Sequence, residues 1–148
     1  DADDETTYAP AMYLTAEGSD PADAFEADDW RDQGADRLHA AIALSGKLNA
    51  VTLLKGCGSI IALPSGSWYI NSSGNPGMAS AGMGDVLTGL AAALLAQGWE
   101  AGPALLCAVH LHGVAADQLV ENGIGPAGLT ASETIDAARR IFNAWVHR

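Results

Sequence analysis

The sequence reads Asn75-Pro-Gly-Met-Ala-Ser-Ala-Gly-Met-Gly-Asp85 at its centre, and the apolar run 86–96 follows at once. This pattern predicts a glycine-rich turn that leads into a helix whose first residue is a carboxylate. Gly82 and Gly84 can adopt positive φ and carry no side chain, so a phosphate could approach their backbone amides closely. Asp85 would repel that phosphate unless a metal ion or a proton intervenes. A carboxylate held so close to a phosphate is placed to act as a general base. The simpler alternative is that Asp85 caps the helix.

Three extended segments precede the turn. Residues 50–54 form a short, nearly continuous apolar run, which is typical of a strand covered on both faces in a parallel sheet flanked by helices. Residues 59–63 and 68–71 predict two further strands, joined by a hairpin turn at 64–67. These patterns predict a partial parallel sheet with a hairpin.

Helical spacing surrounds these strands. It is found in four segments, at 36–45, at 86–97, from about 103 to 122, and at 130–145. Gly46 and Gly98 are plausible stops for the first two helices. The sequence Thr130-Ala-Ser-Glu133 has the form of a capping box that begins the last helix. Together the elements predict an α/β fold, with few strands for a complete doubly wound sheet.

Composition and charge predict one soluble domain behind an acidic lead-in. The chain has 148 residues, of which 49% are hydrophobic and 17% charged, and its net charge is -11. Residues 1–36 carry twelve of the eighteen acids and one base, whereas the remainder is balanced. We therefore expect residues 1–35 to be a solvated or poorly ordered lead-in and residues 36–148 to form the folded domain. Nucleic acid is excluded as a partner, because no basic surface is present.

The expected cellular location rests on three features that are not found in this sequence: a membrane span, a signal peptide and a disulfide framework. The apolar run 86–96 is interrupted by Thr88 and Gly89 and is shorter than the roughly 18 residues of a membrane span, so none is predicted. The N-terminus is acidic where a signal peptide would be basic. Cys57 and Cys107 are too few for a disulfide framework. We expect free thiols and a cytoplasmic protein.

A second candidate site lies at the end of the buried strand, in Lys55-Gly-Cys-Gly-Ser59. Ligands of open α/β sheets bind outside the carboxyl ends of strands, where Lys55 could reach a nucleotide phosphate. Gly56 and Gly58 would let the main chain pass close to it. Alone, the pattern also fits an exposed charge that opens a hairpin. Its combination with the turn at 75–85 favours a nucleotide site.

Other candidate residues have two interpretations each. Asn75 could bind phosphate or end the strand before it. Met83, like Met78, could contact an adenine or fill the core, and the core is favoured. His110 and His112 are two residues apart and would lie on different helix faces, so no metal site is predicted.

These residues carry a resemblance to a known family. The quoted turn with its continuation to Gly89, the segment Leu53-Leu-Lys-Gly-Cys-Gly-Ser59, Leu94-Leu-Ala-Gln-Gly98 and His112-Gly-Val-Ala-Ala-Asp117 resemble the ADP-dependent NAD(P)H-hydrate dehydratases of the ribokinase-like superfamily. The likeness covers roughly 36–146 and corresponds to the C-terminal half of that domain. It implies repair of nicotinamide cofactor: the (S)-hydrate of NADH or NADPH (NADHX or NADPHX) loses water at the expense of ADP, which gives AMP and phosphate.

The resemblance also implies a role for each site residue. Lys55, Gly56, Cys57, Gly58 and Ser59 match the loop that holds the nucleotide, and Gly84 matches a glycine at the adenylate. Asp85 matches the aspartate at the hydrate, where it would act as the general base. The amides of residues 82–85, including those of Gly82 and Met83, would stabilise the transferring phosphoryl group. Mg²⁺ would complete the neutralisation of the negative charge on the phosphoryl group. No residue is nominated as its ligand.

The chain departs from the family pattern in length. A complete domain is nearly twice as long, and its N-terminal half, with a His-Pro-Gly-Glu-type loop, has no counterpart here. We therefore expect a fragment, one part of an assembly or a degenerate copy, and either a homo-oligomer or association with the missing N-terminal half. Two other functions stay open: a ribokinase-like small-molecule (vitamin) kinase that uses ATP, and an inactive fragment or nucleotide-binding assembly half.

Overall fold

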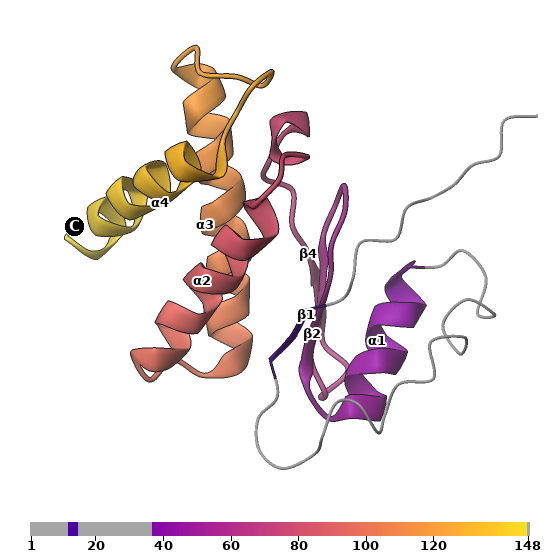
Figure 1. The fold of residues 1–148 in the computed structure, drawn as a ribbon. Helices are drawn as coiled ribbons and strands as arrows, with labels where there is room; N and C mark the ends of the chain where they lie inside the picture. Colours follow the sequence, from indigo (N-terminus) through magenta and orange to yellow (C-terminus); the bar gives the residue numbers. More distant parts are fainter. Residues whose placement is uncertain (1–11, 15–36, 148) are drawn as a thin grey trace, which may run out of the picture. The chain divides into compact units, whose positions relative to one another are not determined.

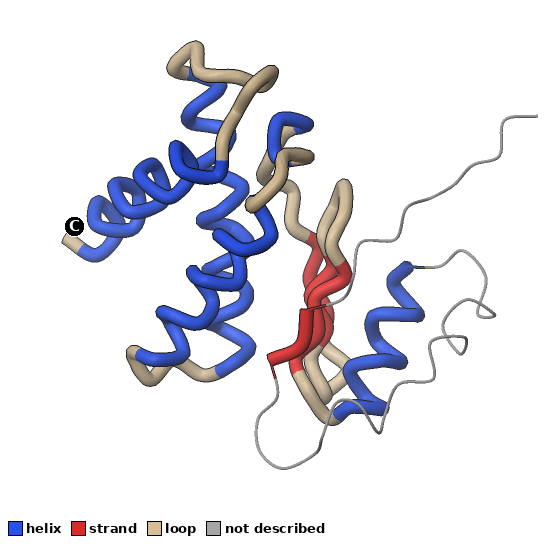
Figure 2. Tube along the Cα trace, viewed as in Figure 1, coloured by secondary structure: helices blue, strands red, loops and turns tan. Residues whose placement is uncertain are grey.

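The computed structural model describes residues 12–14 and 37–147, which belong to two compact units, Asp1–Ile70 and Asn71–Arg148. Figure 1 shows a sheet and the helix Arg37–Leu48 in the first unit and a group of helices in the second. Figure 2 shows that all described strands lie in the first unit. The predicted lead-in at 1–35 lies outside the described residues, except for a short strand at Met12–Leu14 that was not predicted.

The first unit is built on a four-stranded sheet in the order β1-β2-β3-β4. Every described pairing is antiparallel, with Met12 opposite Leu53 and Leu53 opposite Ile61. The strands are β1 (Met12–Leu14), β2 (Val51–Leu54), β3 (Ile60–Ala62) and β4 (Trp68–Ile70).

The α/β class and the hairpin are confirmed, but the parallel pairing predicted for residues 50–54 is wrong for the strands described. Their connections, 55–59 and 63–67, are far shorter than the crossover of about a dozen residues that parallel neighbours require. Burial of β2 was predicted correctly, since Val51, Thr52 and Leu53 are all buried. Burial on both faces does not determine strand direction. The apolar run at 50–54 therefore could not distinguish parallel from antiparallel pairing.

Helix α1 (Arg37–Leu48) packs against one face of this sheet. Two buried hydroxyl groups join the helix to the strands. Ser45 donates to the carbonyl oxygen of Ala50 (2.6 Å) and lies 3.1 Å from that of Ala62, and Thr52 donates to the carbonyl oxygen of Ala41 (3.2 Å). The apolar contact consists of Ala41, Ile60 and Ala62, with Leu38, Ile42 and Leu54 around them.

The end of α1 differs from the predicted stop at Gly46. The helix continues to Leu48, and Asn49 then adopts a positive φ of 48°. The amide of Ala50 donates to the carbonyl oxygen of Ser45 (3.2 Å) and closes the last turn. Asparagine tolerates this left-handed conformation better than most residues, so it takes the place that glycine usually has.

Over its described residues, 71–147, the second unit contains three long helices and one short 3-10 helix. Helix α3 contacts both α2 and α4, and its buried side chains form the centre of the unit's core. Their bounds are η2 (Pro76–Met78), α2 (Met83–Ala96), α3 (Ala101–Glu121) and α4 (Ala131–Val146). The buried core consists of Met83, Leu111, Ala115, Ala116, Leu119, Leu129, Ala137, Ala138 and Ile141.

The predicted capping box begins α4. The amide of Glu133 donates to Oγ1 of Thr130 (3.4 Å), and Oε2 of Glu133 accepts from the hydroxyl (2.7 Å) and the amide (2.9 Å) of Thr130. The side-chain hydrogen bond, then the backbone one, lowers the pKa of Glu133. The ionised carboxylate therefore stabilises the first turn of α4.

Helix α3 is, within the described ranges, long and apolar enough to cross a membrane by length and composition, which the sequence-based prediction did not foresee. More than half of its apolar window (56%) is buried inside the structure. The central helix of a globular core passes the same test, and α3 has that position in the second unit.

Candidate active site

The glycine-rich turn enters α2 through a left-handed glycine. Gly82 is the N-cap residue with φ 84° and ψ -12°, and its carbonyl oxygen accepts the first helical bond from the amide of Val86 (3.1 Å). A Cβ atom on Gly82 would also lie 3.2 Å from Cβ of Ala131 at the start of α4. The positive φ and the close neighbour together require glycine at this position.

Asp85 is the third residue of α2, not the first as predicted, because Met83 and Gly84 are already helical. Its side chain is exposed and makes no hydrogen bond or ion pair within the described part of the chain. Met83, Val86 and Leu87 are buried and hold this end of the helix in place. The amides of Gly84 and Asp85 have no intrahelical acceptor and can bind an anion, whereas the amide of Met83 donates to the carbonyl oxygen of Ser80 (3.3 Å). The structure thus presents a free carboxylate beside a set of backbone donors.

The two further residues proposed at this turn have structural contacts. Met83 is 3% exposed, lies in the core and accepts a hydrogen bond at Sδ from the hydroxyl of Thr134 (3.5 Å). Asn75 caps η2: its Oδ1 accepts from the amide of Gly77 (3.0 Å), and its Nδ2 donates to Oδ1 of Asp117 (3.0 Å). Burial favours the core interpretation of Met83, and both ends of the Asn75 side chain are occupied.

The loop 55–59 is the turn between β2 and β3, in the first unit. Gly56 and Gly58 have positive φ, Cys57 is exposed, and the side chain of Lys55 is half-buried. Ser59 closes the loop, because its hydroxyl donates to the carbonyl oxygen of Gly56 (3.1 Å) and accepts from the amide of Gly56 (3.3 Å). The ammonium group of Lys55 has no ion pair among the residues described. The geometry is that of a hairpin, and it leaves this cation available to a ligand.

Arg37 holds the loop and was missed by sequence reasoning. Its Nη1 donates to the carbonyl oxygen of Cys57 (2.9 Å) and its Nη2 to that of Lys55 (3.2 Å). The fork of the guanidinium group thus spans the loop from α1. The only signal in the sequence is that Arg37 is the first base after the acidic segment, which does not indicate this contact.

The candidate residues form two groups, one in each compact unit. Lys55, Gly56, Cys57, Gly58 and Ser59 belong to the first unit, whereas Asn75, Gly82, Met83, Gly84 and Asp85 belong to the second.

The two histidines of α3 lie in different surroundings. His110 is exposed and stacks on Trp145 (ring centroids 5.9 Å apart, planes at 15°), whereas His112 is buried. No group of three potential ligands occurs among the described residues.

A glycine-capped helix N-terminus beside an exposed carboxylate, in an α/β fold, is an arrangement typical of proteins that bind phosphate groups. The family model described as NAD(P)H-hydrate dehydratase matches residues 23–139. The chain belongs to the NAD(P)H-hydrate dehydratase family. The match begins inside the acidic segment, and the predicted boundary between residues 35 and 36 stays a prediction.

Named relatives are similar over most of this chain. The bifunctional NAD(P)H-hydrate repair enzyme Nnr of Moorella thermoacetica is 45% identical over 101 residues, which is 68% of this chain and 19% of the relative. The ADP-dependent (S)-NAD(P)H-hydrate dehydratase of Neisseria meningitidis serogroup B is 42% identical over 109 residues, 74% of this chain and 37% of the relative.

A solved structure has the same fold. It is the ADP/ATP-dependent NAD(P)H-hydrate dehydratase from Bacillus subtilis, co-crystallised with ATP/Mg²⁺ and soaked with CoA. The TM-score is 0.70 at 32% identity, and the match covers 74% of this chain and 40% of that one. The chain therefore spans less than half the length of each of these proteins.

Proposed function

We propose that this chain carries the phosphate-binding turn and the general base of an ADP-dependent (S)-NAD(P)H-hydrate dehydratase. The observation that carries the proposal is the exposed Asp85, unpaired within the described residues, three positions after the left-handed Gly82. Family membership and the names of the relatives supply the substrate class.

Phosphorylation makes the dehydration feasible. Hydroxide is a poor leaving group, whereas a phosphate ester leaves readily. Asp85 takes the proton of the substrate hydroxyl as its oxygen attacks the terminal phosphorus of ADP, and the bond from that phosphorus to AMP breaks. The ester then loses phosphate with the electron pair of the carbon–oxygen bond, a neighbouring carbon gives up a proton, and the double bond of the dihydronicotinamide is restored.

The helix start supplies the electrostatic part of this reaction. The amides of Gly82, Gly84 and Asp85 would donate to the oxygens of the transferring group, where the positive end of the helix dipole favours negative charge, whereas the amide of Met83 donates to the carbonyl oxygen of Ser80. Mg²⁺ is usually held by one or two carboxylates together with phosphate oxygens, and no residue of this chain is nominated as its ligand. When bound, it would neutralise the charge that two phosphates bring next to Asp85.

We also propose that the loop 55–59 binds the nucleotide. The rate at which Cys57 is alkylated can show whether nucleotide is bound there. Cys57 is exposed, whereas Cys107 is half-buried, and burial raises the pKa of the Cys107 thiol. Because the thiolate is the reactive form, iodoacetamide should alkylate Cys57 well before Cys107. Saturating ADP with Mg²⁺ should slow alkylation of Cys57 and leave Cys107 unchanged, as measured by peptide mass spectrometry. Equal rates at Cys57 with and without ADP would count against a nucleotide at this loop.

The complete protein tests the function directly. With ADP, Mg²⁺ and NADPHX, we expect release of phosphate and AMP together with recovery of the NADPH absorbance. A kinase would instead use ATP and accumulate a stable phosphorylated product. A folded protein that binds ADP but releases no phosphate from NADPHX would refute the dehydratase proposal and favour a nucleotide-binding assembly half.

We propose that the competent form includes the polypeptide that corresponds to the remainder of the relatives' domain, in the same chain or associated with it. The partial coverage of the Bacillus subtilis structure (40%) supports this. Strand β4 is exposed at all three of its residues and, among the strands described, pairs on one edge only. Self-association is the alternative, and the free cysteines fit a reducing cytoplasm.

A further inference from the structure

The carboxylate of Asp117, on helix α3, binds the segment that leads into the glycine-rich turn. Its Oδ2 accepts from the backbone amide of Gly74 (2.8 Å), and its Oδ1 accepts from Nδ2 of Asn75 (3.0 Å). The proposed chemistry gives Asp117 no role. We propose that Asp117 is a positioning residue, which sets the orientation of the turn and thereby of Asp85; this inference rests on the proposed function.

A continuous series of hydrogen bonds connects Asp117 to the start of α2. From Asn75, Oδ1 accepts the amide of Gly77 (3.0 Å), and the carbonyl oxygen of Gly77 accepts the hydroxyl of Ser80 (2.9 Å). The carbonyl oxygen of Ser80 then accepts the amide of Met83 (3.3 Å), the first residue of α2. Met83 is two residues before Asp85. A shift at Asn75 would therefore be transmitted to the helix end that holds the base.

A carboxylate suits this position better than an amide. It presents two acceptors to two donors at once, and bonds to an ionised acceptor are about twice as strong as neutral ones. Asparagine at 117 would offer one acceptor and turn its own donors toward Gly74 or Asn75. One of the two bonds would be lost, and the turn would gain freedom.

A second anchor lets the segment stay attached without Asp117. The hydroxyl of Ser73 lies 3.2 Å from the carbonyl oxygen of His110 and 2.9 Å from Oδ1 of Asn71. His110, Gly113 and Asp117 are spaced as i, i+3 and i+7 along one face of α3, and the segment 73–75 follows that face. Removal of the Asp117 carboxylate should therefore reorient the turn without detaching it.

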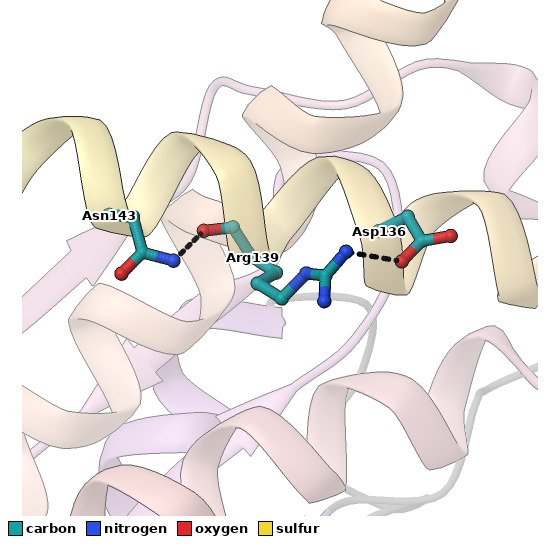
Figure 3. Close-up of polar contacts among 3 residues, drawn as sticks. All are labelled: Asp136, Arg139 and Asn143. Carbon is teal, nitrogen blue, oxygen red and sulfur yellow. Dashed lines mark hydrogen bonds and ion pairs between the residues drawn. The ribbon is translucent and has the colours of Figure 1, made fainter.

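The test compares Asp117→Asn with Asp136→Asn in the complete protein. Asp136 lies on α4, and its Oδ1 pairs with Nη2 of Arg139 (3.3 Å) where both side chains are mostly exposed; Asn143 donates to the carbonyl oxygen of Arg139 (Figure 3). Such a pair contributes little, so this control removes the same charge outside the hydrogen-bond series.

For Asp117→Asn we expect kcat to fall by roughly 10- to 100-fold while KM for ADP changes by less than about threefold, because misplacement of a catalytic group weakens the transition state. Hydrogen exchange of peptides covering 74–83 should quicken in Asp117→Asn and not in Asp136→Asn. Asp117→Asn with wild-type kcat and wild-type exchange would overturn the inference. So would an equal loss of kcat in both variants.

Two further outcomes keep the inference testable. If Asp117→Asn does not fold, Asn75→Ala breaks the same contact from the turn, and its peptides 77–83 must then exchange faster than those of the wild type. If the wild-type protein has no dehydratase activity, the proposed function fails, yet faster exchange in Asp117→Asn would still support the positioning role. Unchanged exchange in the variant that folds would refute it.

Discussion

Asp85→Asn is expected to lower kcat of the complete enzyme by roughly a hundred- to ten-thousand-fold, the usual contribution of a general base. The amide is nearly isosteric with the carboxylate but cannot take the proton of the substrate hydroxyl. ADP should bind as well as or better than in the wild type, since the repulsion between Asp85 and the phosphates disappears. Phosphate release and calorimetric titration with ADP measure the two effects.

Stability should change little in this variant. Asp85 is exposed and its carboxylate, within the described residues, has no partner, so the loss is limited to its favourable position at the helix N-terminus, about 0.3–1 kcal/mol. The control Asp136→Asn should keep full turnover. A folded Asp85→Asn protein with wild-type kcat would exclude Asp85 as the base, and so would a loss of ADP binding that accounts for all of the lost activity.

Local patterns predicted helix α1, strands β2 to β4 and the three long helices, but not β1 or η2, and the ends of the elements depended on particular residues. Both the hairpin turn at 64–67 and the capping box at Thr130 depend on residues that are adjacent in sequence, and both are confirmed. The end of α1 was misplaced because Asn49 supplied the left-handed residue that was expected from Gly46. The direction of β2 depends on its connections and not on its apolar run.

The supports of the candidate site could not be predicted, because they act over long sequence separations. Arg37 reaches carbonyl groups 18 and 20 residues away, and Asp117 reaches donors 42 and 43 residues away. No periodicity links such positions. Asp117 did carry a weak signal, as an acid within the largely apolar helix α3, where a charge usually has a partner. The residues of the turn itself could be predicted from the sequence, because glycine and aspartate at a helix start limit the possible chemistry.

The second prediction with a large expected effect concerns Gly113, which lies on the same face of α3 as Asp117. A Cβ atom on Gly113 would overlap Oγ of Ser73 and would lie 2.7 Å from the carbonyl carbon and 2.8 Å from Cβ of that residue. Two of these atoms are fixed to the backbone, so the segment 71–75 would have to move. Gly113→Ala is therefore expected to destabilise the protein by about 1–3 kcal/mol, as overpacking of a core does, although alanine is the better helix former. Turnover should fall as well, since the same segment leads to the turn.

Gly89→Ala in α2 is the matched control. This helical glycine is exposed, and a Cβ atom there would meet no heavy atom within 4 Å. The same substitution should stabilise the protein by about 0.5–1 kcal/mol, because alanine restricts the unfolded chain and favours the helix. Urea unfolding of the complete protein measures both variants, with opposite shifts of the midpoint expected. If Gly113→Ala were as stable as Gly89→Ala, the close approach of Ser73 to α3 would not exist in solution, and the support of the turn by this helix would be disproved.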